Sequence, residues 1–388
     1  MIQIKDFNAS VSEQELERRR AGAQKCMEEK GVDCLLLVGF GVSMGSAIRY
    51  FTDWVCWDTG VYAMLPKKGK LMLWGSGQEG EPALPPYLYR GIGESTSYPY
   101  FPSLSFASHF IPEHITAYVK DNGYKVIGLY RQPLISYVII DALRECGCEF
   151  VNMDDEIDLL QAVKSEEEIA AFEEVARLHD TVYAALGCFV RPGRIEHEIA
   201  VDIKKCCLDL CCEELNIMVG SGNPIGKHKP YFMQNRRLEP GDSVDILVEV
   251  TAPGGLFGEV SRMWSLGKPS SALEKAFADA MEIQEYLASI AKPGLPAREL
   301  MVQLHKFQDS HGYEREKRLF AHSQGYDVVM RPCCMLNETL ELKENMLLAI
   351  HPFMQSDSAF AMVTDNFLIT PQGGKMMSNT PRKIYVVE

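Results

Sequence analysis

The sequence predicts an α/β domain followed by an α+β domain. Residues 1–158 alternate helical and strand-like segments, which is the pattern of an α/β layer. Residues 159–388 begin with two long helical segments and continue with strands in close succession, which indicates an antiparallel sheet. An acidic stretch at 154–158 separates the two patterns, so we place the domain boundary at 158/159.

The first domain shows its elements in a clear order. Residues 13–30 are amphipathic, carry their charges on one side and stop at Gly31, which is typical of a helix. A second helix is expected at 135–146, and strands are expected at 32–40, 70–74, 124–130 and from 150 onward. No GxGxxG motif follows the first strand, which argues against a dinucleotide site.

The second domain begins at a capping box. Ser165 is a good N-cap and Glu168 stands three residues later, so a helix is expected at 166–188. Further helices are expected at 195–214, 271–291 and 297–311, and strands at 216–220, 243–250, 258–266, 347–353, 359–369 and 383–387. Arg191-Pro-Gly193 recurs as Lys292-Pro-Gly294, each after a long helix, which suggests two similar halves in this domain.

Composition excludes several classes of protein. The 388 residues carry a net charge of −14, so the chain repels phosphate backbones and nucleic acid is not expected as a partner. The longest apolar runs, such as 34–38 and 346–350, fall far short of the roughly 20 residues that a membrane span needs. With no leader-like N-terminus, we expect a cytoplasmic protein that has no membrane partner. Its 12 cysteines contain no CxxC pair and are expected to be reduced, buried thiols.

Seven short segments become informative through their order along the chain: residues 48–52, 164–169, 222–228, 238–242, 258–262, 322–325 and 345–352. Among them, Gly258-Glu-Val-Ser-Arg262, His322-Ser-Gln-Gly325 and the segment ending in His351-Pro352 resemble the motifs xDxTR, HxxG and GMxxxxEP of the creatinase/aminopeptidase P family. The resemblance covers nearly the whole chain. It implies a small α/β N-terminal domain, a catalytic C-terminal domain of the pita-bread fold and assembly as a homodimer.

The metal ligands that this resemblance implies are incomplete here. Metallopeptidases of the family hold two divalent ions with two Asp, one His and two Glu, and use them to activate water. These five positions fall on Leu247, Glu259, His322, His351 and Thr364. Leucine cannot bind a metal ion and threonine is a poor ligand, so the standard two-metal site is not expected.

Two alternatives remain for the polar residues at these positions. In the first, Glu249, the carboxylate nearest to Leu247, joins Glu259, His322 and His351 to hold one Zn²⁺, Fe²⁺ or Mn²⁺ ion. In the second, no metal binds and the chain works as creatinase does. His228, at the family's substrate-facing histidine, is then the general acid/base, with Glu259 or His351 orienting water or a cationic substrate group.

The expected substrate is a small molecule. Trp54 and Trp57 follow the first strand and could hold a cationic group by cation–π attraction, and Arg331 could clamp a substrate carboxylate. We therefore expect a hydrolase that cleaves a C–N bond in a small amidine, amide or amino-acid-derived compound, with His228, Glu259 and His351 as catalytic residues. The alternatives are a single-metal Xaa-Pro dipeptidase variant, a C–S lyase similar to dimethylsulfoniopropionate lyases, and a catalytically inactive pseudo-peptidase that binds a ligand.

Overall fold

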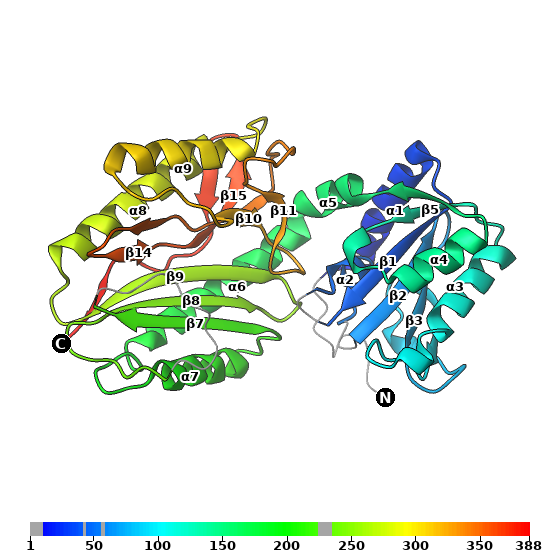
Figure 1. Ribbon diagram of the computed structural model, residues 1–388, viewed down its shortest axis with the longest axis horizontal. Coiled ribbons are helices and arrows are strands. Elements are labelled where there is room, and N and C mark those ends of the chain that lie inside the picture. Colours follow the sequence, from blue (N-terminus) through cyan, green and yellow to red (C-terminus); the bar gives the residue numbers. More distant parts are fainter. Residues whose placement is uncertain (1–10, 42–43, 56–58, 224–234) are drawn as a thin grey trace. The chain divides into compact units, whose positions relative to one another are not determined.

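The chain forms two compact units in a computed structural model, residues 1–161 and residues 162–388 (Figure 1). The structure describes residues 11–41, 44–55, 59–223 and 235–388. The predicted combination of an α/β unit with an α+β unit is confirmed. Within the described residues, no helix is both long enough and apolar enough to span a membrane.

The first unit is built on one six-stranded sheet in the order β4-β3-β2-β1-β5-β6. β1 pairs antiparallel with β2 and parallel with β5. The bounds of its strands are Cys34–Phe40 (β1), Thr59–Pro66 (β2), Leu71–Ser76 (β3), Ile92–Tyr98 (β4), Val126–Leu129 (β5) and Glu149–Asn152 (β6). The helices of this unit are Glu13–Lys30 (α1), Ser46–Thr52 (α2), Phe110–Asp121 (α3), Tyr137–Glu145 (α4) and Asp154–Ala162 (α5), the last of which leads into the second unit.

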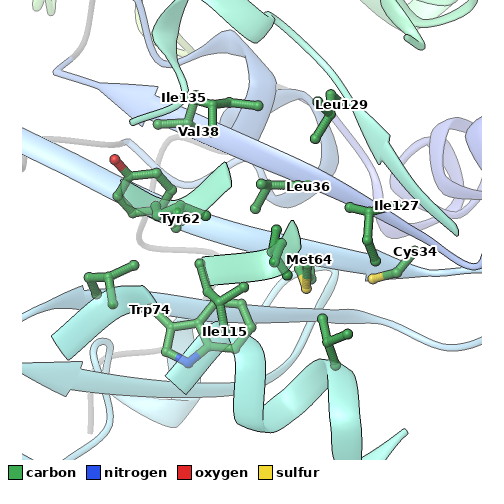
Figure 2. Close-up of a cluster of buried hydrophobic side chains, with 14 of the residues drawn as sticks. Cys34, Leu36, Val38, Tyr62, Met64, Trp74, Ile115, Ile127, Leu129 and Ile135 are labelled. Carbon is green, nitrogen blue, oxygen red and sulfur yellow. The ribbon is translucent and has the colours of Figure 1, made fainter. Parts of the chain in front are cut away.

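Local sequence signals explain α1 and the core beneath α3. Ser12 caps α1 by accepting a hydrogen bond from Glu15 N, and Gly31 ends it with φ 69°, a left-handed conformation that glycine adopts without strain. Leu36 on β1, Trp74 on β3 and Ile115 on α3 belong to one buried apolar cluster (Figure 2). Burial of these side chains holds the sheet against the helix.

The second unit contains two antiparallel sheets and a hairpin. One sheet has the order β17-β9-β8-β7, and the other β11-β10-β12-β15-β16. The strand bounds are Leu215–Gly222 (β7), Ser243–Thr251 (β8), Phe257–Leu266 (β9), Ala321–Ser323 (β10), Met330–Cys333 (β11), Leu347–Ile350 (β12), Phe353–Gln355 (β13), Phe360–Met362 (β14), Asp365–Thr370 (β15), Gly373–Met376 (β16) and Tyr385–Val387 (β17). β17 differs from the others because it runs parallel to β9.

Helices cover both sides of this unit. They are Glu166–Leu186 (α6), Glu196–Asp209 (α7), Ser271–Ile290 (α8) and Arg298–His311 (α9). The predicted capping box is confirmed: Glu168 N donates to Ser165 Oγ (3.2 Å), and Ser165 N donates to the Glu168 carboxylate (2.9 Å). Figure 1 shows α8 and α9 along one side of the sheets, while α7 lies on the other side and contacts β7.

The two sheets of the second unit meet where β9 approaches β15. Ser261 N donates to Thr364 O (3.2 Å). The buried Arg262 guanidinium donates to the carbonyl oxygens of Ser261 and Thr364 and forms a salt bridge with Asp365 (2.6 Å). Side chains from both sheets can therefore reach one site between them.

Candidate metal centre

Three side chains from the two sheets of the second unit converge on one point. Glu259 lies on β9, His322 lies on β10, and His351 follows β12 directly. Their ligand atoms all lie within 4.8 Å of one another. Glu259 Oε1 is 3.8 Å from His322 Nε2 and 3.7 Å from His351 Nε2, and the two imidazole ring centroids are 5.3 Å apart.

Strand pairing brings the two histidines together. β10 and β12 are antiparallel neighbours in which His322 lies opposite Ala349, two residues before His351. His351 N donates to Phe320 O (2.8 Å), which extends the pairing to the histidine itself. The imidazoles are thus placed by main-chain hydrogen bonds of the sheet, which holds them more firmly than a loop would.

His322 is held in the form that binds a metal ion. Its Nδ1 lies 3.0 Å from Ser323 O, and because a carbonyl oxygen only accepts, Nδ1 carries the hydrogen. Nε2, which is 3.8 Å from Glu259 Oε1, then carries the lone pair. Burial lowers the pKa of His322 to about 4, so the ring is neutral at neutral pH.

Glu249 lies beside the three converging side chains. β8 and β9 pair with Glu249 directly opposite Glu259, so both side chains are on the same face of the sheet and their carboxyl groups share a hydrogen bond. Burial raises the pKa of Glu249 to about 7. Burial, reinforced by the charge of Glu249, raises the pKa of Glu259 well above its usual value. At neutral pH the pair therefore retains a proton.

A dication fits this arrangement. The donor set is one carboxylate and two imidazoles, which suits Zn²⁺, Fe²⁺ or a similar transition metal ion. Glu259 Oε1 is buried and has no hydrogen-bond partner among the described residues, although it faces both imidazoles. A cation bound between Glu259, His322 and His351 would give this buried oxygen the electrostatic partner that it otherwise lacks.

The register locates the remaining predicted ligand positions. Leu247 lies opposite Ser261, and the residue of β8 directly opposite Glu259 is Glu249. Thr364 is buried at the start of β15, and its Oγ1 has no hydrogen-bond partner among the described residues. The resemblance implies a carboxylate at this position, where this chain carries a hydroxyl.

Sequence reasoning missed three amide side chains around Glu249. Asn216 Nδ2 donates to Glu249 Oε2 (2.6 Å), and Gln324 Nε2 donates to Glu249 Oε1 (3.2 Å). Asn366 Nδ2 donates to Gln324 Oε1 (2.7 Å). Gln324 lies inside the His322-to-Gly325 motif and could have been noticed there, whereas Asn216 and Asn366 approach the site only through strand pairing.

The predicted substrate-binding residues have different outcomes. The Arg331 guanidinium donates to Glu338, with Nη2 at 2.7 Å from Oε1 and Nε at 3.3 Å from Oε2, and its predicted contact with a substrate carboxylate stays a prediction. Trp54 follows α2 in the first unit and is half-buried. Trp57 and His228 lie outside the described residues.

Two large cavities lined by described residues lie away from the converging side chains. A cavity of about 590 Å³ lies between α8 and the C-terminal segment around Lys383. Another of about 550 Å³ lies between α6, Trp264 and the segment from Asn379 to Val387. The candidate site is therefore identified by its three converging ligand side chains, without the help of a cavity.

Together, the fold and the site define a two-domain protein with a buried centre of two histidines and a carboxylate in its second unit. The model of metallopeptidase family M24 matches residues 170–371, slightly more than half of the chain. The chain belongs to this family. The predicted relationship to the creatinase/aminopeptidase P family and its pita-bread fold is confirmed.

Curated relatives carry peptidase names. The chain is 24% identical over 238 residues to the probable dipeptidase PepE of Mycobacterium tuberculosis, an alignment that spans 60% of this chain and 63% of that protein. It is 25% identical over 267 residues to the Xaa-Pro dipeptidase of Pyrococcus furiosus, which spans 64% of this chain and 73% of that protein. These names denote hydrolases, which is the class predicted for this chain.

Solved structures share the fold over almost the full length. The X-Pro aminopeptidase of Thermotoga maritima superposes with a TM-score of 0.80 at 19% identity, covering 95% of this chain and 99% of that one. The dipeptidase PepE of Mycobacterium ulcerans superposes with a TM-score of 0.78 at 20% identity, covering 97% and 99%. At this level of identity the likeness concerns the fold alone.

Proposed function

We propose that the chain is a single-metal hydrolase that cleaves the amide bond of a dipeptide or a similar small amino-acid derivative. The observation that carries this proposal is the convergence of Glu259, His322 and His351, whose ligand atoms lie within 4.8 Å of one another. The relatives named as dipeptidases support the substrate class. Glu259, His322 and His351 hold one divalent transition metal ion.

Such an ion would polarise the substrate carbonyl and make water a nucleophile at neutral pH. The protein supplies the conditions for that chemistry. His322 is fixed as a neutral ligand by Ser323 O, and the buried surroundings strengthen every charge interaction in the site. Two nitrogen donors and one carboxylate would leave room at the ion for substrate and water.

We assign the role of general acid/base to Glu249. Both of its carboxyl oxygens accept amide hydrogen bonds, so the group has a fixed orientation beside Glu259. Directly opposite Glu259 in the pairing of β8 with β9, this carboxylate is placed to take a proton during attack by water and to return that proton to the leaving amine. Glu259 then remains available to the cation through Oε1.

Three other functions remain as outcomes of the test. Metal-free, creatinase-like hydrolysis depends on His228, which lies outside the described residues. A C–S lyase would use the same cation site on another substrate. A ligand-binding pseudo-peptidase needs no converging donors, and the convergence of both described motif histidines with Glu259 favours an active centre instead.

The test is metal analysis combined with substrate screening. Protein purified without added metal or chelator is compared with a variant carrying His322→Ala and His351→Ala. A His305→Ala variant serves as the control, because that imidazole contacts Glu316 O and is not part of the donor cluster. We expect about one ion per chain in the wild type and the control, almost none in the double variant, and dipeptide hydrolysis that follows metal content.

Two results would contradict the proposal. The first is a wild type that takes up no Zn²⁺, Fe²⁺ or Mn²⁺ on incubation. The second is full activity after chelation, which would favour metal-free catalysis and direct the screen to guanidino and betaine-like compounds. The homodimer implied by the resemblance stays a prediction, which the mass of the protein in solution tests.

A further inference from the structure

We propose that Asn216, Gln324 and Asn366 form an amide strap that sets the position of the metal ligand Glu259 relative to the two histidines. The inference rests on the proposed metal site and assigns a role to three residues that bind no metal themselves. They are positioning residues, because they act through Glu249 and through the main chain of Glu259.

The strap is a continuous series of hydrogen bonds. Asn216 Nδ2 and Gln324 Nε2 each donate to one oxygen of Glu249, at 2.6 Å and 3.2 Å. Asn366 Nδ2 donates to Gln324 Oε1 at 2.7 Å, and Glu259 N donates to Asn366 Oδ1 at 2.8 Å. Glu249 closes the series, since it lies directly opposite Glu259 in the pairing of β8 with β9.

The strap crosses between the two sheets that supply the ligands. Glu259 belongs to the β17-β9-β8-β7 sheet, whereas His322 and His351 belong to the sheet that contains β10 and β12. Asn216 lies on the first sheet, while Asn366 lies on β15 of the second and Gln324 follows β10 directly. The geometry of the ligands thus depends on how the sheets are joined, and the strap joins them beside the ligands.

A role in ligand positioning also explains why these groups are buried. Gln324 is fully buried, and Asn366 is 7% exposed. Burying an amide is unfavourable unless its donors and acceptors are used, and apolar side chains would fill the same space without that requirement. Each of the two amides uses its oxygen and its nitrogen within the series.

The test measures metal affinity and ligand geometry directly. Gln324→Met keeps the length of the side chain and removes both of its hydrogen bonds, and Asn216→Ala removes the other amide donor to Glu249. Gln161→Met is the matched control, because Gln161 is a buried amide of the first unit that donates to Tyr130 Oη. Each protein is titrated with Co²⁺ by calorimetry, its Co²⁺ absorption spectrum is recorded, and its thermal unfolding is measured without metal.

We expect Gln324→Met to weaken Co²⁺ binding by about 10- to 100-fold, the range seen when groups that orient metal ligands are removed, and to change the Co²⁺ spectrum. The control should bind Co²⁺ with an affinity within twofold of the wild type and with an unchanged spectrum.

Wild-type affinity and spectrum in both Gln324→Met and Asn216→Ala would overturn the strap while leaving the metal site intact. A wild type that binds no Co²⁺ would instead overturn the proposed function, and the strap with it. If Gln324→Met does not fold, Asn216→Ala decides alone, because Asn216 is only half-buried on the edge strand β7.

Discussion

Replacing Glu259 by glutamine is expected to remove metal binding and, at the same time, to stabilise the metal-free protein. The substitution keeps the volume of the side chain and removes its charge. In the metal-free site, Glu249 and Glu259 are buried opposite each other on β8 and β9. Two neighbouring buried carboxylates cannot both ionise without a large free-energy cost.

The effect comes from Glu259 itself, because burial and the charge of Glu249 raise the pKa of Glu259 well above its usual value. A glutamate whose folded pKa is raised destabilises the fold above its unfolded pKa of about 4.3, and glutamine at the same position carries no such penalty. A pKa difference of one corresponds to about 1.4 kcal/mol, so we expect metal-free Glu259→Gln to gain at least about 1 kcal/mol in unfolding free energy at pH 8.

The assay is urea unfolding of chelator-treated protein at pH 8, together with metal analysis of untreated protein. A second glutamate-to-glutamine variant, Glu338→Gln, is the matched control. Its unfolding free energy is expected to change in the opposite direction. The Glu338 carboxylate accepts hydrogen bonds from Arg331 and from the main-chain N–H groups of Cys333, Thr339 and Leu340. Loss of that charge should destabilise the protein.

The reasoning would be refuted if metal-free Glu259→Gln were less stable than the metal-free wild type. That result would mean that the two carboxyl groups stabilise the fold together. Retention of one ion per chain by Glu259→Gln would separately refute the role of Glu259 as a ligand.

Three further predictions concern pH, metal preference and the junction of the sheets. Burial alone would raise the pKa of Glu338, but its hydrogen bonds from Arg331 and the main chain outweigh burial and lower it. The stability that this group contributes is therefore present above the unfolded pKa of about 4.3 and is lost as pH falls through the lower folded value. The difference in urea midpoint between wild type and Glu338→Gln should accordingly be largest at pH 7 and shrink toward pH 3; a constant difference would contradict this account. Because two of its three donors are imidazoles, the site should bind Zn²⁺ and Co²⁺ far more tightly than Mg²⁺ in calorimetric titrations, and equal affinities would count against the donor set. Asp365→Asn leaves the fully buried Arg262 without its salt bridge, so we expect a loss of about 3–5 kcal/mol in unfolding free energy; a loss below 1 kcal/mol would show that the carbonyl partners of Arg262 suffice.

Much of the fold could be predicted because its signals are local. The capping box of Ser165 and Glu168 and the helix stop at Gly31 each involve residues a few positions apart, so the structure reproduces both. β4 was not predicted, since its sequence Ile92-Gly-Glu-Ser-Thr-Ser-Tyr98 is mostly polar. As an edge strand it pairs on one side only, and a polar composition is tolerated there.

The candidate site was predictable only in part. His322, His351 and Glu259 were found by their positions in motifs, and the structure brings these three together. That Glu249 and not Leu247 lies directly opposite Glu259 could not be predicted, because a spacing along one chain does not give strand register. Arg331 looked available for substrate, whereas a carboxylate seven residues later engages it.

The sequence by itself determined the family and the fold class, because both depend on residue types at fixed positions along the chain. Only the tertiary structure decided that Glu249 lies opposite Glu259, that Asn216 and Gln324 donate to Glu249, and that Asn366 donates to Gln324. Those relations depend on strand pairing and on the junction of two sheets. Both depend on packing between residues that are far apart in sequence, so no local sequence pattern predicts them.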